Sequence, residues 1–201
     1  MRRRWLAGIL AWSCVCVASS FVSVPGARGA AAPLTVGVVE FYAPTPLDSY
    51  PGIVPESFAT EDLSRLLARY ATGQVTVIPA ATMRHAEGDV RWRDADVLHF
   101  DRLRDLARAV SADRLVVRLI PQFNVDWGGD PSADGGKGPI VAEANVVVQV
   151  FDAGAGRLVG ETRQFASSTG GSTGQVVMNS LHAVLERSTP ALLNLLGVPG
   201  S

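Results

Sequence analysis

The segment from Val141 to Ala166 constrains the fold of this chain more than any other stretch, because it predicts two β-strands joined by a tight turn at residues 152–157. The alternation of its residues is typical of an antiparallel strand that is covered on one side and partly solvated on the other. The Gly and Asp residues of the turn tolerate the positive φ angles that tight reversals need. The face expected to be covered carries Ala142, Ala144, Val146, Val148 and Val150. The mixed face carries Glu143, Asn145, Val147, Gln149 and Phe151.

Strand and helix patterns alternate upstream of this hairpin. The first strand (LTVGVVEF) is apolar on both faces, which favours a central place in a sheet. Asp101 is the predicted N-cap of a later helix. In chain order, the predicted elements are a strand at 34–41, a helix at 56–70, a strand at 74–78, short helical turns around 82–86 and 93–97, a helix at 101–111 and a strand at 114–126.

A helix is predicted to follow the hairpin. Ser172-Thr173-Gly174-Gln175 has the form of a capping box, and apolar residues recur at helical spacing after it. Pro190 is expected to break or kink this helix before a short leucine-rich tail. The order β-α-β-α-β-β-β-α predicts an α/β fold, in which helices pack on a mixed parallel and antiparallel sheet.

The beginning of the chain has the layout of a secretory signal peptide. Arg2, Arg3 and Arg4 form a basic start, residues 5–24 are apolar, and small residues follow where cleavage would occur. We therefore expect a signal peptide at 1–29 and a periplasmic or secreted location. The remainder, 30–201, is expected to be a single α/β domain with a flexible loop at 127–139. The apolar run is also about long enough for a membrane anchor, so retention as an anchor is the alternative.

Both cysteines of the chain, Cys14 and Cys16, lie within this leader. The indole of Trp12 stands two residues before Cys14, where a lipoprotein signal needs a small residue, so lipidation is not predicted. Cleavage would remove four of the 18 basic residues and none of the 19 acidic residues, which would lower the net charge from −1 to −5. A mildly acidic chain without cysteine has no disulfide and is not expected to bind nucleic acid. No integral membrane segment is expected after cleavage.

The sequence GGSTG around Ser172 matches the G-x-S-x-G pattern of serine hydrolases, and it lies between a predicted strand and a predicted helix. A hydrolase of that type needs an acid and a histidine after the serine. Only His182 and Glu186 follow, on the helix that the serine would open, and His182 would lie roughly 15 Å away along it. His85 and His99 have no pattern that brings them near. We interpret Ser172 as a helix cap and keep a secreted serine hydrolase as an alternative function.

The other candidate motifs predict no cofactor and no metal site. Lys137 lies in a glycine-rich stretch that lacks the spacing of a phosphate loop. His85 and Glu87 form an H-x-E pair without the cysteines of zinc deaminases. The loop at 127–139 leaves a small-ligand or metal-binding module as a further alternative, although its aspartates do not have calcium-loop spacing. The remaining residues of interest in irregular regions are Trp92, Trp127, Asp126, Asp130 and Asp134.

The whole pattern resembles extracytoplasmic α/β domains related to the curli-secretion protein CsgG and to the amino-terminal domain of TolB. The residues that carry the resemblance are the opening VGVVEF, the later VTVIP, the segment LRDLARAVSADRLVVRLI and the hairpin end VFDAGAGRLV. Ser111-Ala112-Asp113 stands where those families have Gly-Ala-Asp, and Ala155 replaces the Thr of their Asp-x-x-Thr-Gly turn. The resemblance covers roughly residues 34 to 190, and it implies assembly, scaffolding or activation of other proteins in the bacterial envelope.

These observations predict an exported, non-enzymatic interaction or assembly protein of the bacterial cell envelope. Its expected partners are envelope proteins or further copies of itself. No catalytic, cofactor-binding or metal-binding residue is predicted.

Overall fold

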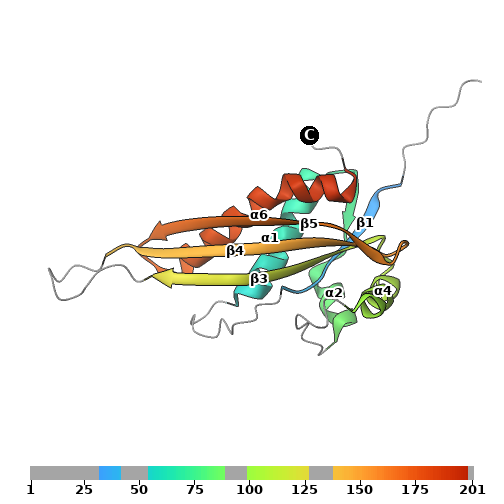
Figure 1. Cartoon of the computed structure of the whole chain (residues 1–201), viewed down its shortest axis with the longest axis horizontal. Coiled ribbons are helices and arrows are strands. Elements are labelled where there is room, and N and C mark those ends of the chain that lie inside the picture. Colours follow the sequence, from blue (N-terminus) through green and yellow to red (C-terminus); the bar gives the residue numbers. More distant parts are fainter. Residues whose placement is uncertain (1–31, 42–53, 89–98, 127–137, 199–201) are drawn as a thin grey trace, which may run out of the picture. The chain divides into compact units, whose positions relative to one another are not determined.

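A five-stranded sheet with the spatial order β2-β1-β3-β4-β5 forms the centre of the fold (Figure 1). The computed structural model describes residues 32–41, 54–88, 99–126 and 138–198, which belong to one compact unit. The strands are β1 (Leu34–Val38), β2 (Val75–Val77), β3 (Arg114–Asp126), β4 (Ile140–Asp152) and β5 (Arg157–Gly170). The helices are α1 (Pro55–Tyr70), α2 (Ala80–Glu87), α4 (Phe100–Ala109) and α6 (Thr173–Leu196).

The sheet is parallel on one side and antiparallel on the other. β1 pairs in parallel with β2 and β3, whereas β3, β4 and β5 pair antiparallel. The predicted mixed sheet and the central place of β1 are therefore confirmed. β1 has only five residues, but β3, β4 and β5 have 13 or 14. The sheet consequently narrows from five strands near the β4–β5 turn to three strands farther from it.

The β4–β5 turn forms where the sequence predicts it, with Asp152 paired to Arg157 across it. The Asp152 carboxylate accepts the N–H of Ala155 at 2.8 Å and forms an ion pair with Arg114 at 3.0 Å. Gly156 closes the turn with a φ of +64°, a conformation that residues with a Cβ adopt at a cost. The turn is thus attached to the start of β3 by the same aspartate that shapes it.

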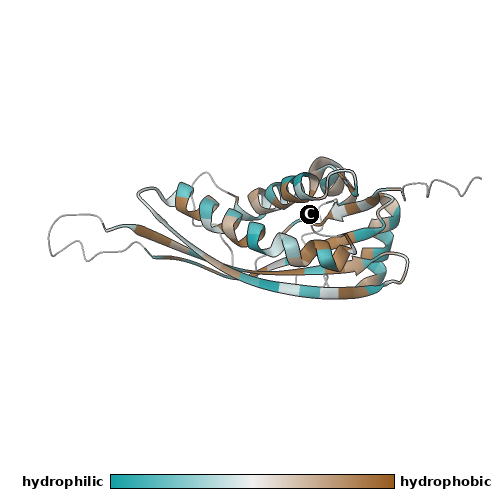
Figure 2. Ribbon diagram, turned by 90° about the horizontal axis from the view of Figure 1, so that it is seen from above, coloured by the Kyte–Doolittle hydropathy of each residue, from teal (hydrophilic) through white to brown (hydrophobic). Residues whose placement is uncertain are grey.

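Helices cover the two faces of the sheet unequally. α1 and α6 pack on one face, where the larger core contains the buried alanines and valines of β4. α2 and α4 pack on the other face near β1, and the smaller core there extends on β3 and β4 only to Val117 and Phe151. Figure 2 shows α6 above the long strands and no helix below the half of these strands that is farther from the turn. Among the described residues, one face of the three-stranded part therefore has no helix packed on it.

The helix starts differ from the sequence prediction at two places. α4 begins after His99, so Asp101 lies in its first turn instead of at the N-cap, and Asp101 pairs with Arg104 at 3.0 Å. The irregular stretch after β2 contains α2, an eight-residue helix whose Met83 is buried in the smaller core. Burial of Met83 and Glu87 fixes a helix that the local sequence predicts only weakly.

α6 continues through Pro190 to Leu196, and the break expected at this proline does not occur. A proline inside a helix removes one backbone hydrogen bond and crowds the preceding turn. Leu192 and Leu193, which follow Pro190, are buried in the larger core. The apolar surface buried by this last part of α6 outweighs the local cost of the proline.

Asp113 joins the starts of β1 and β3 to the hairpin turn. Its carboxylate accepts the N–H of Thr35 at 2.8 Å, and its own N–H donates to the carbonyl of Thr35 at 2.9 Å. The carbonyl of Asp113 accepts the N–H of Ala153 at 3.1 Å. Ser111, two residues earlier, has a φ of +55° and follows the end of α4. The Ser-Ala-Asp motif therefore has a structural role at this junction.

Within the described ranges, no helix combines the length and the apolar character that a membrane crossing requires.

Candidate functional site

Ser172 is the N-cap residue of α6, as predicted, but its side chain makes no capping hydrogen bond there. The capping box is therefore correct in position and wrong in its predicted bond. Gly170, just before it, belongs to β5 and lies against the start of α6, since a Cβ at this position would come within 2.8 Å of Val176. Close packing of the strand end on the helix fixes the connection without the serine hydroxyl.

His182 lies on α6 and contacts α1. Its Nδ1 lies 2.7 Å from a carboxylate oxygen of Asp62, which also forms an ion pair with Arg65 at 3.2 Å. The side chain of Asp62 is 8% exposed and that of His182 is 46% exposed. A second contact between these helices joins Tyr70 to Glu186 at 3.1 Å. The histidine and the acid that a hydrolase would need are therefore both used to hold α6 on α1.

The H-x-E pair is divided between solvent and protein interior. His85 is exposed on α2, whereas Glu87 is buried at the end of the same helix, and the carboxylate of Glu87 accepts the N–H of Glu40 at 3.3 Å. His99 is exposed before α4, and Asp126 ends β3. In the part of the chain that the structure describes, no group of three His, Cys, Asp or Glu residues could hold a metal ion. Four other candidates lie outside the described residues: Trp92, Trp127, Lys137 and the pair Asp130 and Asp134.

Arg118 is a buried cation that no sequence motif indicated. Val38 is the last residue of β1 that pairs with β3, and Arg118 lies two residues beyond its partner Val116. The guanidinium donates to the carbonyl of Val39, which has just left the ladder, and to the hydroxyl of Thr60 at 3.3 Å. Arg118 therefore fills the notch that opens in the sheet where β1 ends.

The charge of Arg118 is balanced by an aromatic ring and two carboxylates. Its guanidinium carbon lies 3.8 Å from the centroid of the Phe41 ring, which is a cation–π contact. Burial lowers the pKa of Arg118 to about 9, and attraction to Glu87 and then to Glu40 opposes that shift. At neutral pH the group stays charged, although Nε and Nη1 have no hydrogen-bond partner among the described atoms.

The cluster around Arg118 is closed to solvent. Arg118 is 1% exposed and Glu87 is 6% exposed, so neither offers a surface on which a ligand could bind. A displaced pKa in a cleft is a common sign of a functional site, but buried structural ion clusters produce the same sign. We interpret this cluster as part of the architecture at the end of β1.

A larger candidate site is the face of the long strands that α2 and α4 leave uncovered. We call it the open face. Alternation along the strands defines it, because the residues between its members are buried against α1 and α6. Its members are Gln122, Asn124 and Asp126 of β3; Val141, Glu143, Asn145 and Gln149 of β4; and Glu161, Arg163, Phe165, Ser167 and Thr169 of β5, while Val147 of β4 points to the same side but is buried.

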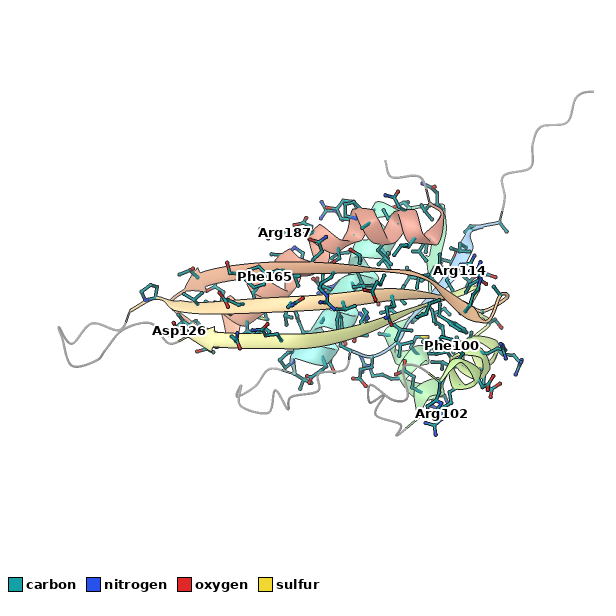
Figure 3. The ribbon with its side chains drawn as sticks, viewed as in Figure 1. Phe100, Arg102, Arg114, Asp126, Phe165 and Arg187 are labelled. Atoms are coloured by element: carbon teal, nitrogen blue, oxygen red, sulfur yellow. The ribbon has the colours of Figure 1, made fainter. Side chains whose placement is uncertain are left out.

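Phe165 is the most exposed large apolar side chain of the open face, at 51%. In Figure 3 it lies on β5, in front of the helices, well away from Phe100 at the α4 end. Phe165 pairs with Asn145 on β4, whose amide oxygen is buried and has no hydrogen-bond partner in the described structure. The middle of this polar face is thus partly dehydrated beside an exposed aromatic ring.

The free edge of the sheet is occupied beside Phe165. β5 is an edge strand, and unpaired edge strands are available for pairing with other chains. Arg187 of α6 donates to the backbone carbonyl of Phe165 at 2.9 Å. The edge is therefore partly blocked at this point, whereas the face next to it stays open.

No protein-family model matches the chain, and no curated protein matches its sequence. Solved structures share its fold. The hypothetical protein CT253 from Chlamydia trachomatis has a TM-score of 0.52 at 12% identity, with coverage of 82% of this chain and 98% of that one. The lipoprotein GNA1162 from Neisseria meningitidis has a TM-score of 0.50 at 13% identity, with coverage of 82% and 99%. These likenesses show a common α/β fold, and they do not single out the CsgG or TolB families.

Proposed function

We propose that this chain is a non-enzymatic, exported protein of the bacterial envelope that works by binding protein through its open face. The carrying observation is the long sheet face that the described helices leave uncovered, with Phe165 exposed in its middle row. Exposed aromatic residues are enriched at the centres of protein interfaces. The predicted signal peptide supports the location, and the fold is one that the lipoprotein GNA1162 shares.

The use of the candidate catalytic residues supports a non-enzymatic role. Ser172 lies at the start of α6, while His182 on the same helix is paired with Asp62 of α1. Nucleophilic catalysis needs a base within hydrogen-bond reach of the serine. His182 is ten residues along the helix, or roughly 15 Å by helix geometry, and its Nδ1 already has a carboxylate partner.

Photo-crosslinking in intact cells tests this proposal. A photoreactive amino acid placed at Phe165 is expected to give a covalent adduct with a protein, because the side chain would lie inside the contact. The same amino acid at Ala68, which is exposed on α1, is the control and is expected to give none. Absence of any adduct from Phe165 and from Ser167 would contradict the proposal.

A further inference from the structure

One row of side chains divides the open face into two halves. Phe165 of β5 lies opposite Asn145 of β4, and Asn145 lies opposite Gln122 of β3. Residue pairs on either side of this row are about 6–7 Å from it, because each two-residue step along a strand covers that distance. A rotation of 180° about the row exchanges the two halves of the face.

The two halves carry opposite charges one step from the row, on the neighbouring strands β5 and β4. One step toward the β4–β5 turn, the pair is Arg163 with Val147. One step away from the turn, the pair is Ser167 with Glu143. If a second copy is placed on the first by the rotation, the β5 strands lie over each other and the β4 strands lie over each other. Arg163 of each copy then lies beside Glu143 of the other copy, so the interface contains two such contacts.

We propose that two copies of this chain pack open face against open face, with a two-fold axis along the row of Phe165. The proposal rests on the proposed function and names the partner as a second copy. The Phe165 rings of the two copies meet at the axis, flanked by two Arg163–Glu143 ion pairs. Such an interface is isologous, since each copy offers the same surface to the other.

The geometry of sheets agrees with this arrangement. Sheets stack face to face about 10 Å apart with their strands nearly aligned, which a phenylalanine and an arginine side chain can span. Arginine and carboxylate form short, charge-assisted hydrogen bonds that are frequently bidentate. At the next step from the row, Glu161 of one copy lies over Thr169 of the other, so the rotation opposes no like charges there.

The blocked edge favours face packing over edge pairing. A second copy that paired along β5 would have to displace Arg187 from the carbonyl of Phe165. Face packing leaves that bond in place, because a backbone carbonyl of an edge strand points along the sheet and not out of its face. Arg187 therefore occupies the sheet edge at Phe165 and leaves the Phe165 side chain exposed on the open face.

Charge exchange tests the proposal with the full chain, purified from the host that processes it. Light scattering and sedimentation velocity are expected to show a dimer. Arg163→Glu alone and Glu143→Arg alone each create two pairs of like charges across the interface. Each is expected to weaken self-association by at least about tenfold. The double variant Arg163→Glu with Glu143→Arg restores opposite charges and is expected to recover the dimer.

Arg108→Glu on α4 makes the same change of net charge as Arg163→Glu, at an exposed position outside the open face, and is expected to leave the dimer unchanged. Circular dichroism confirms that every variant is folded. A monomeric wild-type protein, or a dimer that none of the exchanges weakens, overturns the proposal. A monomer whose Phe165 still crosslinks to a different protein in cells overturns the second copy as partner and leaves the proposed function standing, whereas absence of all adducts overturns both.

Discussion

The guanidinium carbon of Arg118 lies 3.8 Å from the centre of the Phe41 ring, in the layer between the sheet and α1. This contact lies where β1 ends and β3 continues without β1 as its neighbour. An ammonium group would not serve equally, because the planar guanidinium stacks on an aromatic face and also donates in its own plane. Arg118 therefore completes the transition from a five-stranded to a three-stranded sheet.

Arg118→Met is expected to destabilise the protein by about 3 kcal/mol, since it removes a buried cation that attracts the buried carboxylate of Glu87. Urea unfolding followed by circular dichroism measures the loss. Adding Glu87→Gln removes the negative charge that attracts Arg118 but keeps an acceptor for the N–H of Glu40. The double variant should lose clearly less than the sum of the two single losses, and simple additivity would argue against coupling between the two side chains.

Stability should depend on alkaline pH through Arg118. Burial lowers the pKa of Arg118 to about 9 in the folded protein, so above that pH the folded chain holds fewer protons than the unfolded chain. Linkage then makes the free energy of unfolding rise with pH, by about 1 kcal/mol between pH 9 and about pH 10. Below about pH 9 Arg118 is protonated in both states, so its effect on the pH dependence of the unfolding free energy vanishes. The rise is measured as the difference between wild type and Arg118→Met, and equal slopes for the two would contradict it.

Gly156→Ala should destabilise the hairpin turn by about 1 kcal/mol, because the φ of +64° is unfavourable for alanine. A Cβ there would also displace the guanidinium of Arg104, whose flexible side chain can move away. Gly154→Ala is the matched control in the same turn. Its nearest contact would be 3.4 Å from the Asp152 carboxylate, so its expected effect is within a few tenths of a kcal/mol. Similar losses for both variants would show that φ is not the cause.

Ser172→Ala should change the free energy of unfolding by only a few tenths of a kcal/mol, below the roughly 1 kcal/mol that removal of a bonded N-cap costs. The reason is that the Ser172 side chain forms no capping bond. Thermal unfolding measures this change. A fluorophosphonate probe supplies the second readout, and labelling that disappears in Ser172→Ala would revive the serine hydrolase alternative.

Asp62→Ala should destabilise the protein by about 2 kcal/mol, because this carboxylate is 8% exposed and holds His182 of α6 against α1. Asp105→Ala removes a carboxylate of α4 that is 73% exposed and pairs with Arg108, and it should be nearly neutral. Chemical denaturation of both variants provides the comparison. Equal losses for the two variants would mean that burial of the Asp62–His182 pair contributes nothing to the free energy of unfolding.

The sheet could be predicted from sequence because the first strand is apolar on both faces and the strands of the hairpin alternate. Ala142 to Val150 bury every second residue, and the Asp152 turn has the residues that its geometry needs. The continuity of α6 could not be predicted in this way. Pro190 is a local signal for a break, and the opposing term is burial against a sheet that the helix meets only in the folded state.

The buried cluster around Arg118 could not be predicted from the sequence. In the sequence it is one arginine within an apolar strand, and alternation alone places it on the covered face without saying what would balance its charge. The balancing groups, Glu40 and Glu87, come from other parts of the chain. The open face was visible as polar alternation in β4, but its exposure depends on how far α2 and α4 extend.

The two hydrogen bonds between Asp113 and Thr35 join residues that are synthesised far apart in time. Thr35 emerges from the ribosome 78 residues before the aspartate that will bind it. Until then β1, an apolar strand with two partners to find, has neither its β3 neighbour nor the carboxylate that aligns it. An interior strand of the finished sheet is thus made first and paired late, and for that interval its apolar surface and unpaired edge are open to misassembly.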